Sequence, residues 1–423
     1  MPVSVSVSWG GVASMKYLLW GIVLCYLLIA SVYNFVVTPG GGPDEVAHLK
    51  YIKVLALEHR LPQAAETHQA QHPPLYYALG AVVYVATPFL SEDGRLHAIR
   101  FLSLLLGLAS LLLIGSGLAA LFPDKPALLL LSVGTMAFHP LFSLESGVIN
   151  NDLLATFAFS LFIYLLMISL KNRSFDKRIS LYMGLATGIG FLAKQTSFVM
   201  PFLFAVLLWR KRSFLGINKV LNLAGVFALT ALAISGWWYA LNYLRYGRLI
   251  YYSCLMPMQK NMDIIMLLAN LDLFVKPIST ILQRTIISFW APLWIIRRFF
   301  DDLHIYIAAA FLLPLLPIAG IIRLARQHRS YRNISLLLLS VVVFTLAGII
   351  YYALTVDYRA VEGGRYLLAA LPAVAILIGS GFSTLLPRRF ALPLAIVILL
   401  AMLAGDIYCL SAARLYHQLG LHV

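Results

Sequence analysis

The feature that most constrains the fold of this chain is a succession of long apolar segments separated by short polar ones. The apolar runs lie at about 16–37, 73–90, 97–122, 126–144, 148–170, 180–193, 196–209, 218–244, 279–296, 303–322, 334–356, 366–386 and 391–412. A helix needs about 20 apolar residues to cross the hydrocarbon of a bilayer, and each run is that long or nearly so. Since 61% of the residues are hydrophobic and only 12% are charged, we expect an all-α polytopic membrane protein. The runs predict about 11 to 13 transmembrane helices.

The net charge of +15 would suggest a nucleic-acid partner in a soluble protein. Here the basic residues gather in short runs between apolar segments, at 171–178, 210–212, 323–332 and 388–389. Such runs are typical of cytoplasmic loops, so we predict a lipid bilayer and no nucleic acid as the partner. The three cysteines, Cys25, Cys254 and Cys409, are far apart and indicate neither a disulfide framework nor a zinc site. The first apolar run is too long for a cleaved signal peptide and is predicted to be a retained span.

Alternation of the spans places the other polar segments on the opposite face. These are the loop at 38–72 if the N-terminus is cytoplasmic, the segment at 145–152, the turn at Lys194, the loops at 245–277 and 357–365, and the C-terminus. The three runs between 73 and 144 leave an odd number of crossings, so we expect one of them to be re-entrant or interfacial; the run at 279–296 is a second candidate. Without an internal repeat, the chain is predicted to be a single membrane domain over 1–423, with a core at 16–212 and C-terminal helices at 213–423.

The loop at 38–72 begins with three glycines and a proline, which cannot continue a membrane helix. Asp44 and Glu45 follow in the first turn of a predicted helix that extends to about Arg60, and His48 lies one turn beyond Asp44. Such acids either cap a solvated helix or perform chemistry at the membrane surface. Carboxylate and imidazole also bind metals, so a divalent metal on Glu45 and His48 stays open, although the spacing fits no defined motif.

Two further polar clusters fall on the same predicted face as Asp44. Asn150, Asn151 and Asp152 follow Glu145 at the mouth of an apolar run, and three capping residues exceed what one helix N-terminus needs. Lys194 lies in almost unbroken apolar sequence and departs from the positive-inside trend. Such a lysine either serves function or extends towards lipid headgroups.

A fourth cluster comprises Glu362, Arg365 and Tyr366 around a pair of glycines. The planar guanidinium of Arg365 can bind a phosphate through two hydrogen bonds, and glycines allow close approach of a ligand to the backbone. The alternative is a glycine-rich turn in which Arg365 pairs with Glu362. Acids and cations that coincide on one face of the membrane favour a site that activates a hydroxyl and holds an anion.

In this order and spacing, these motifs resemble the GT-C superfamily of integral-membrane glycosyltransferases. The likeness is carried by Pro43-Asp44-Glu45 with His48, by His72-Pro73-Pro74-Leu75-Tyr76-Tyr77, by Asn150-Asn151-Asp152 and by Gly364-Arg365-Tyr366. It is strongest to bacterial relatives of the protein O-mannosyltransferases and the lipid A aminoarabinose transferases. The resemblance implies a GT-C-like helical bundle in a bacterial inner membrane, with short interfacial helices in the first external loop and an active site that faces the periplasm.

The resemblance also implies the chemistry. A sugar on a polyprenyl-phosphate donor would move, with inversion, to a hydroxyl of a lipid-linked, polysaccharide or protein acceptor. Asp44 would be the general base, and Glu45 would bind the acceptor or a metal. The donor phosphate would be held by Lys194, Arg365, His72 and Tyr366, and the substrates by His48, Asn150, Asn151, Asp152, Glu362 and Tyr76. The chain lacks the large soluble insertion of some protein O-mannosyltransferases, which argues against a protein acceptor.

Two other classes of membrane protein fit part of the sequence. A transporter or flippase of lipid-linked glycans would carry ionisable residues deep within its spans and inverted repeats, whereas the charges here crowd the helix mouths. An O-antigen ligase or polymerase would need a large external loop between late spans, of which 245–277 would be a short version.

Overall fold

The computed structural model describes residues 13–172, 175–251, 271–290, 329–355, 364–385 and 387–418, together with positions 318, 322 and 326. All regular secondary structure in these ranges is helical. Most of the loop predicted at 245–277, the loop residues 357–363 with Glu362, nearly all of the run at 303–322 and Cys254 lie outside the described residues.

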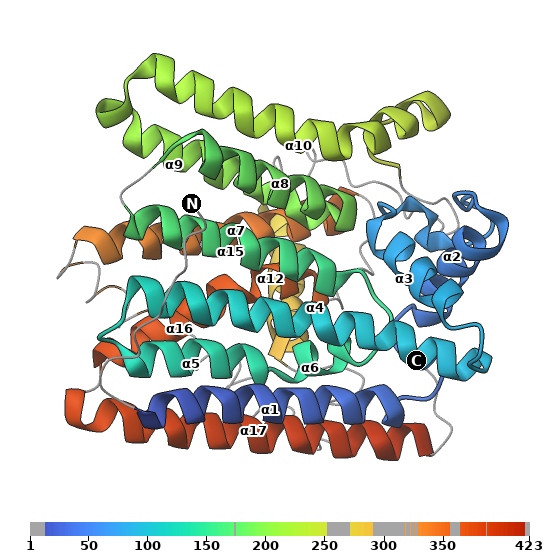
Figure 1. Ribbon diagram of the computed structural model, residues 1–423, viewed down its shortest axis with the longest axis horizontal. Helices are drawn as coiled ribbons and strands as arrows, with labels where there is room; N and C mark the ends of the chain where they lie inside the picture. Colours follow the sequence, from blue (N-terminus) through green and yellow to red (C-terminus); the bar gives the residue numbers. More distant parts are fainter. Residues whose placement is uncertain are drawn as a thin grey trace.

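The chain forms a bundle of long helices that lie nearly parallel to one another (Figure 1). In order they are α1 (Ala13–Val36), α2 (Glu45–Glu58), η1 (His68–Gln71), α3 (Leu75–Ala86), α4 (Glu92–Leu121), α5 (Pro126–Ala137), α6 (Pro140–Ser146), α7 (Asp152–Lys171), α8 (Lys177–Ala193), η2 (Gln195–Phe198), α9 (Val199–Leu215), α10 (Ile217–Tyr246), α12 (Leu271–Trp290), α15 (Arg329–Thr355), η4 (Gly364–Ala370), α16 (Leu371–Leu385) and α17 (Arg388–Gln418). The all-α fold class is therefore confirmed.

Within the described residues, seven helices are long and apolar enough to cross a membrane. An eighth span results if α5 and α6, which meet at a 55° bend, are counted together. Helices α8 and α9 have 17 residues each, which is at the lower limit for a membrane-crossing helix. The described residues thus supply fewer clear spans than the 11 to 13 expected, partly because the run at 303–322 lies outside them.

Helix α3 resolves the odd number of crossings between residues 73 and 144. It has only 12 residues, too few to cross a bilayer, and it packs against α2 and α4 at one end of the bundle (Figure 1). One of the three runs is therefore not a span, as expected, and the loop at 38–72 does carry short helices. Helix α12 begins at Leu271 and not near residue 279, and in Figure 1 it runs across the direction of the long helices.

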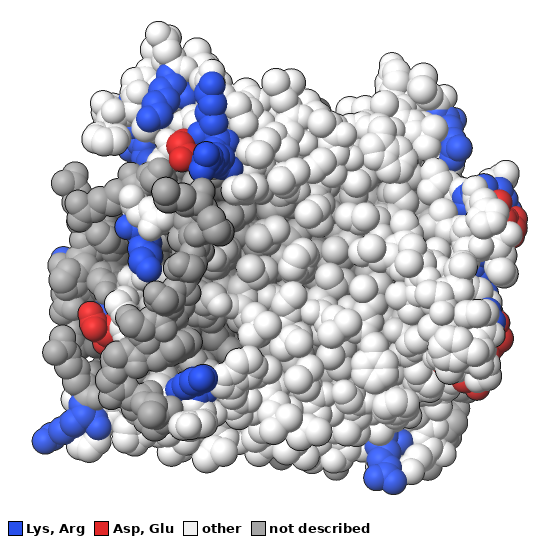
Figure 2. All heavy atoms as spheres, viewed as in Figure 1, with Lys and Arg blue, Asp and Glu red and all other residues white. Residues whose placement is uncertain are grey.

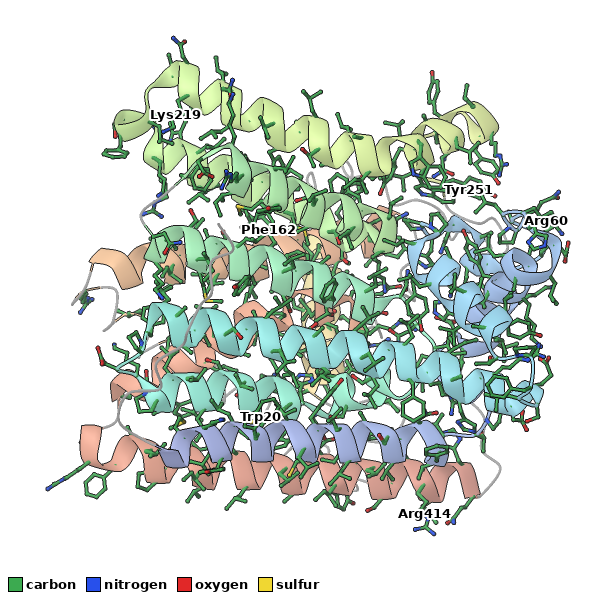
Figure 3. The ribbon with its side chains drawn as sticks, in the orientation of Figure 1. Trp20, Arg60, Phe162, Lys219, Tyr251 and Arg414 are labelled. Atoms are coloured by element: carbon green, nitrogen blue, oxygen red, sulfur yellow. The ribbon has the colours of Figure 1, made fainter. Side chains whose placement is uncertain are left out.

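The charged side chains leave a broad uncharged band around the middle of the visible face and gather towards its two ends (Figure 2). Lys219 lies at one end, which also holds the basic run at 210–212, and Arg60 lies at the opposite end with α2 and α3 (Figure 3). We call these the basic end and the site end. An uncharged band between two charged rims is what a bilayer requires of an integral membrane protein.

Helix α7 is the centre of the bundle. It packs against α4, α8, α16 and η4, and Phe162 lies fully inside (Figure 3). Its neighbour α8 packs closely against α10, and this packing depends on glycine. A Cβ at Gly184 or Gly188 of α8 would meet the α10 backbone within 3.2 Å. Small residues four apart allow helix backbones to approach in this way in a membrane. Packing around α7 therefore sets the positions of the neighbouring helix ends at the site end.

Candidate active site

The turn before α2 adopts a backbone that few residues tolerate. Gly40 and Asp44 both have positive φ angles, 78° and 55°, and aspartate is among the few non-glycine residues that visit this region. Asp44 is the N-cap of α2, but its side chain makes no capping hydrogen bond. The carboxylate is therefore free of the helix end and available for other contacts, which removes the interpretation of Asp44 as a simple cap.

Glu45 holds this turn in place through a buried ion pair. Arg100 of α4 donates to both carboxylate oxygens, from Nε to Oε1 (2.8 Å) and from Nη2 to Oε2 (2.6 Å), and neither side chain is exposed. The remaining Arg100 hydrogens reach the carbonyl oxygens of Asn34, Val37 and Thr38 at the end of α1. All five guanidinium hydrogens are thus matched, which is the condition under which a buried ion pair is tolerated.

The carboxylate of Glu45 is equally well occupied. Besides Arg100 it accepts hydrogen bonds from the backbone N–H groups of Gly40 (3.1 Å), Gly42 (3.2 Å) and Ile149 (2.9 Å). This geometry does not favour the expectation that Glu45 binds acceptor or metal, because its oxygens have no free direction for another ligand. Glu45 thus joins three segments: the turn before α2, helix α4 and the loop before α7.

Asp44 meets Arg365, which lies 321 residues later in the chain at the start of η4. One Asp44 oxygen accepts from Arg365 Nη2, and the other accepts from His68 Nε2 at 3.3 Å. The Asp44 side chain is 30% exposed and that of Arg365 is 21% exposed, so this pair is accessible, unlike the Glu45 pair. Burial raises the pKa of Asp44, but the charge of Arg365 and the His68 hydrogen bond outweigh it and hold the pKa well below its usual range.

Lys194 lies beside this pair and has its own acid. It follows α8, and its Nζ is 2.6 Å from Asp152 Oδ1, with both residues almost completely buried. Nζ also sits 4.7 Å from the centre of the Tyr366 ring. Lys194 therefore points into the protein and does not extend to lipid headgroups, and the structure brings Lys194, Arg365, Tyr366 and Asp152 together at one helix mouth.

Two histidines at this mouth are held in the neutral form. His48 Nδ1 is 3.0 Å from the Tyr77 hydroxyl, and Tyr77 stacks on Tyr51 with ring centres 3.8 Å apart. Burial, opposed in part by Asp44, lowers the pKa of His48 to about 3. Burial and the charge of Lys194 hold the pKa of His72 well below its usual value. Both imidazoles can then donate or accept hydrogen bonds to a ligand without adding charge.

The other predicted substrate contacts have structural partners. Asn150 Oδ1 accepts from the N–H groups of Asp152 and Leu153, so Asn150 caps α7. Asn151 Nδ2 donates to the carbonyl of Ala193 (2.9 Å) and fixes the residue before Lys194. The Tyr76 hydroxyl accepts from the N–H of Asn150 (3.2 Å) and pairs with Ser103. These contacts favour a role for Asn150, Asn151 and Tyr76 in positioning the loop before α7. The remaining predicted substrate contact, Glu362, lies outside the described residues.

Sequence reasoning did not single out Arg100, which organises the loop that bears Asp44. A signal was present, since Arg100 interrupts an apolar run, and ionisable residues within such runs are structural or functional by default. The possible metal is not supported by the donors: among the described residues no group of three histidine, cysteine, aspartate or glutamate side chains is placed to hold one. The Glu45 oxygens are already occupied by Arg100 and by three backbone N–H groups.

The sequence and the fold both have known relatives. Residues 71–238, less than half of the chain, match the family described as dolichyl-phosphate-mannose-protein mannosyltransferase. The structure is similar to that of ArnT from Cupriavidus metallidurans in the apo state, with a TM-score of 0.57 and 14% identity over 94% of this chain and 74% of that one. It is also similar to the Archaeoglobus fulgidus oligosaccharyltransferase, with a TM-score of 0.60 and 14% identity over 94% of this chain and 56% of that one. No curated protein sequence matches the chain.

The structural likeness shows the fold. The chain has the GT-C fold of membrane glycosyltransferases that its motifs predicted, and the partial family match lies within that fold. Identities of this size establish a shared architecture, so the substrates and the roles of individual residues are argued from the site itself.

Proposed function

We propose that the chain transfers a sugar from a polyprenyl-phosphate donor to an acceptor hydroxyl, with inversion, at the extracytoplasmic face of a bacterial inner membrane. The observation that carries this proposal is the contact between Asp44 and Arg365, with Lys194 beside them. A base for a hydroxyl and two cations for a phosphate are the groups that such a reaction requires. The site lies at the end of the bundle opposite the basic run at 210–212, which the positive-inside rule assigns to the cytoplasm.

In the proposed step, Asp44 accepts the proton of the acceptor hydroxyl while the hydroxyl oxygen attacks the anomeric carbon. The bond from that carbon to the phosphate oxygen breaks on the opposite side, which inverts the configuration. The products are the glycoside, a protonated Asp44 and the polyprenyl phosphate. Lys194 and Arg365 stabilise the charge that develops on the leaving phosphate, and neutral His72 is a further hydrogen-bond donor there.

Arg365 connects the two halves of this step. Without a donor, its guanidinium is engaged with Asp44, and an arginine at that position suppresses the basicity of the carboxylate. A bound phosphate competes for the same guanidinium, since two anions then share one cation. We infer that donor binding weakens the hold of Arg365 on Asp44 and so raises the basicity of Asp44 when a sugar is present to receive the acceptor.

The ligands of the structural relatives support this donor class. ArnT from Cupriavidus metallidurans has been solved with undecaprenyl phosphate, and the Archaeoglobus fulgidus enzyme with dolichol phosphate and an inhibitory peptide. For the present chain, a lipid-linked or polysaccharide hydroxyl can enter the step, and so can a protein hydroxyl, which the missing soluble insertion makes the least favoured acceptor. A transporter needs no base beside its cations, so the pairing of Asp44 with Arg365 favours the transferase.

The test is equilibrium binding of undecaprenyl phosphate to the detergent-purified protein. We expect saturable binding by the wild type and at least about tenfold weaker binding by Arg365→Ala and Lys194→Ala, since each loses a charged hydrogen bond to phosphate. Lys219→Ala is the matched control, because Lys219 is an exposed cation at the basic end. Equal affinity of all four proteins would contradict a phosphate site at Arg365 and Lys194.

A further inference from the structure

Glu145 of α6 is a buried carboxyl group. Its exposed fraction is 0%, and neither Oε1 nor Oε2 has a hydrogen-bond partner among the residues that the structure describes. The backbone carbonyl of Glu145, in contrast, does have a partner, because it accepts a hydrogen bond from Asn150 Nδ2 at 2.6 Å. A buried polar group left unmatched destabilises the fold, so such a group in a native protein calls for a partner from outside the protein, such as water or a ligand.

The position of Glu145 relates it to the proposed active site. Its carboxyl group lies close enough to Arg365, Lys194, Asp152 and Asp44 to interact electrostatically with each of them. The two cations of this cluster each pair with another acid: Lys194 pairs with Asp152, and Arg365 pairs with Asp44. Glu145 is the acid of the cluster that takes part in neither ion pair.

Asp406, another buried acid of the bundle, shows the contrast. Asp406 of α17 is also 0% exposed, yet it accepts hydrogen bonds from Ser143 Oγ (2.5 Å) and the Tyr33 hydroxyl (3.4 Å). It lies between α17, α6 and α1 and is satisfied by them. The described part of the protein thus satisfies the carboxyl group of Asp406 with its own hydroxyls, but it offers no such partner to Glu145.

We infer that Glu145 hydrogen-bonds the hydroxyl groups of the transferred sugar and helps to select it. This inference rests on the proposed function. In a glycosyl phosphate the sugar ring is joined directly to the phosphate, so a ring whose phosphate is held by Lys194 and Arg365 lies within the same cluster. A carboxyl group is suited to several ring hydroxyls, because each of its oxygens has two directions for hydrogen bonds. A site that matches a substrate hydroxyl discriminates strongly against a sugar that lacks it.

The inference assigns the sugar and the phosphate of the donor to different side chains, so the test measures their binding separately. Binding is measured for undecaprenyl phosphate without a sugar and for undecaprenyl phosphate that carries glucose or mannose. The proteins are the wild type, Glu145→Leu, Glu145→Gln and, as the matched control, Asp406→Asn. The thermal midpoint of each protein in detergent is recorded first, so that only folded proteins are compared.

We expect Glu145→Leu to bind the sugar-free lipid with unchanged affinity and the preferred sugar lipid about 10- to 100-fold more weakly, because only the latter loses a buried hydrogen bond. Glu145→Gln keeps the size and part of the hydrogen bonding, so an intermediate loss is expected. Asp406→Asn should bind both lipids as the wild type does.

Three results would overturn the inference. One is an equal affinity of the wild type for sugar-free and sugar-bearing lipids, since no side chain would then recognise the sugar. Another is a loss of the same size for both lipids in Glu145→Leu, which would assign Glu145 to the phosphate site or to general packing. Failure of every lipid phosphate to bind the wild type would refute the proposed function itself, and this inference with it.

Discussion

Arg100 and Glu45 form an ion pair from which water is excluded and in which every guanidinium hydrogen and both carboxylate oxygens are matched. Its partners are the end of α1, the turn before α2 and the chain before α7. The pair therefore fixes the position of Asp44 without touching it. A fully buried network of this kind is stable only when complete.

Removal of one partner of this pair should be strongly destabilising. We expect Arg100→Met to lower the stability by about 3–5 kcal/mol, because Glu45 is then buried without a counter-charge. Arg100→Lys should fall in between, since three hydrogens cannot replace five. The measurement is the thermal midpoint in detergent. Arg60→Met is the control: Arg60 pairs with Glu58 and Glu66 near the surface, where solvent screens an ion pair and its contribution to stability is small. Similar losses in the two Met variants would argue against a structural role for Arg100.

Asp44→Asn should separate catalysis from binding. We expect sugar transfer to fall by at least about 10²-fold, because the amide cannot accept the hydroxyl proton. Affinity for undecaprenyl phosphate should stay equal or increase, since Arg365 loses its competing anion. Turnover and lipid binding are measured on the same preparation. Full transfer activity in a well-folded Asp44→Asn protein would exclude Asp44 as the base.

Gly364 should tolerate no side chain. A Cβ there would meet the backbone of Ser288 and Phe289 in α12, and the Gly364 N–H donates to Ser288 Oγ at 2.8 Å. We expect Gly364→Ala to displace the following Arg365 and to weaken lipid-phosphate binding about tenfold or more. Gly348→Ala in α15 is the matched control, because no described atom outside its own stretch of helix lies within 4 Å of its Cβ position. Wild-type binding by Gly364→Ala would show that α12 yields to the new methyl group.

The buried histidines should make the protein sensitive to mild acid. The pKa of His48 is lowered to about 3, whereas an unfolded histidine titrates near 6.5, so the unfolded chain binds more protons between these values. Stability is therefore fully present above about pH 6.5 and declines as the pH falls towards 3, and His72 acts in the same direction. We expect the thermal midpoint to drop between pH 7 and pH 5.

A His48→Asn variant tests the source of this decline. Its midpoint should change less between pH 7 and pH 5 than that of the wild type, even if its stability at pH 7 is lower. His59→Asn is the control, because His59 is exposed at the end of α2 and has a positive φ angle that asparagine tolerates. An equally steep decline in His48→Asn and His59→Asn would assign the effect to other groups.

The sequence predicted the fold class and the side of the membrane on which each polar cluster lies, because hydropathy and basic loops report depth and orientation. On that basis Asp44, Lys194 and Arg365 were expected at one face, and the structure brings them together. The side-chain pairs within the cluster could not be predicted, because the depth of a residue in the membrane does not specify which side of its helix faces which neighbour. Nothing in the sequence indicates that Glu45 pairs with Arg100 or that Asp44 pairs with Arg365.

The roles of adjacent residues were also hard to separate from sequence. Asp44 and Glu45 are both acids in one turn, yet the left-handed backbone at Asp44 directs it to Arg365 while Glu45 enters the protein. Asn150 and Asp152 differ in the same way, since one caps α7 and the other pairs with Lys194. The short α3 was expected only as one of several possibilities, because its run of apolar residues extends past the end of the helix at Ala86.

The long separation between Asp44 and Arg365 has a consequence for biosynthesis. A membrane protein is synthesised from its N-terminus, so Asp44 and the Glu45–Arg100 pair beside it have been made when α4 has been inserted. Arg365 emerges only 321 residues after Asp44. Until then Asp44 lacks the cation that it contacts in the finished fold. In the proposed mechanism, a nascent chain would therefore hold the base before it holds the second cation of the phosphate site.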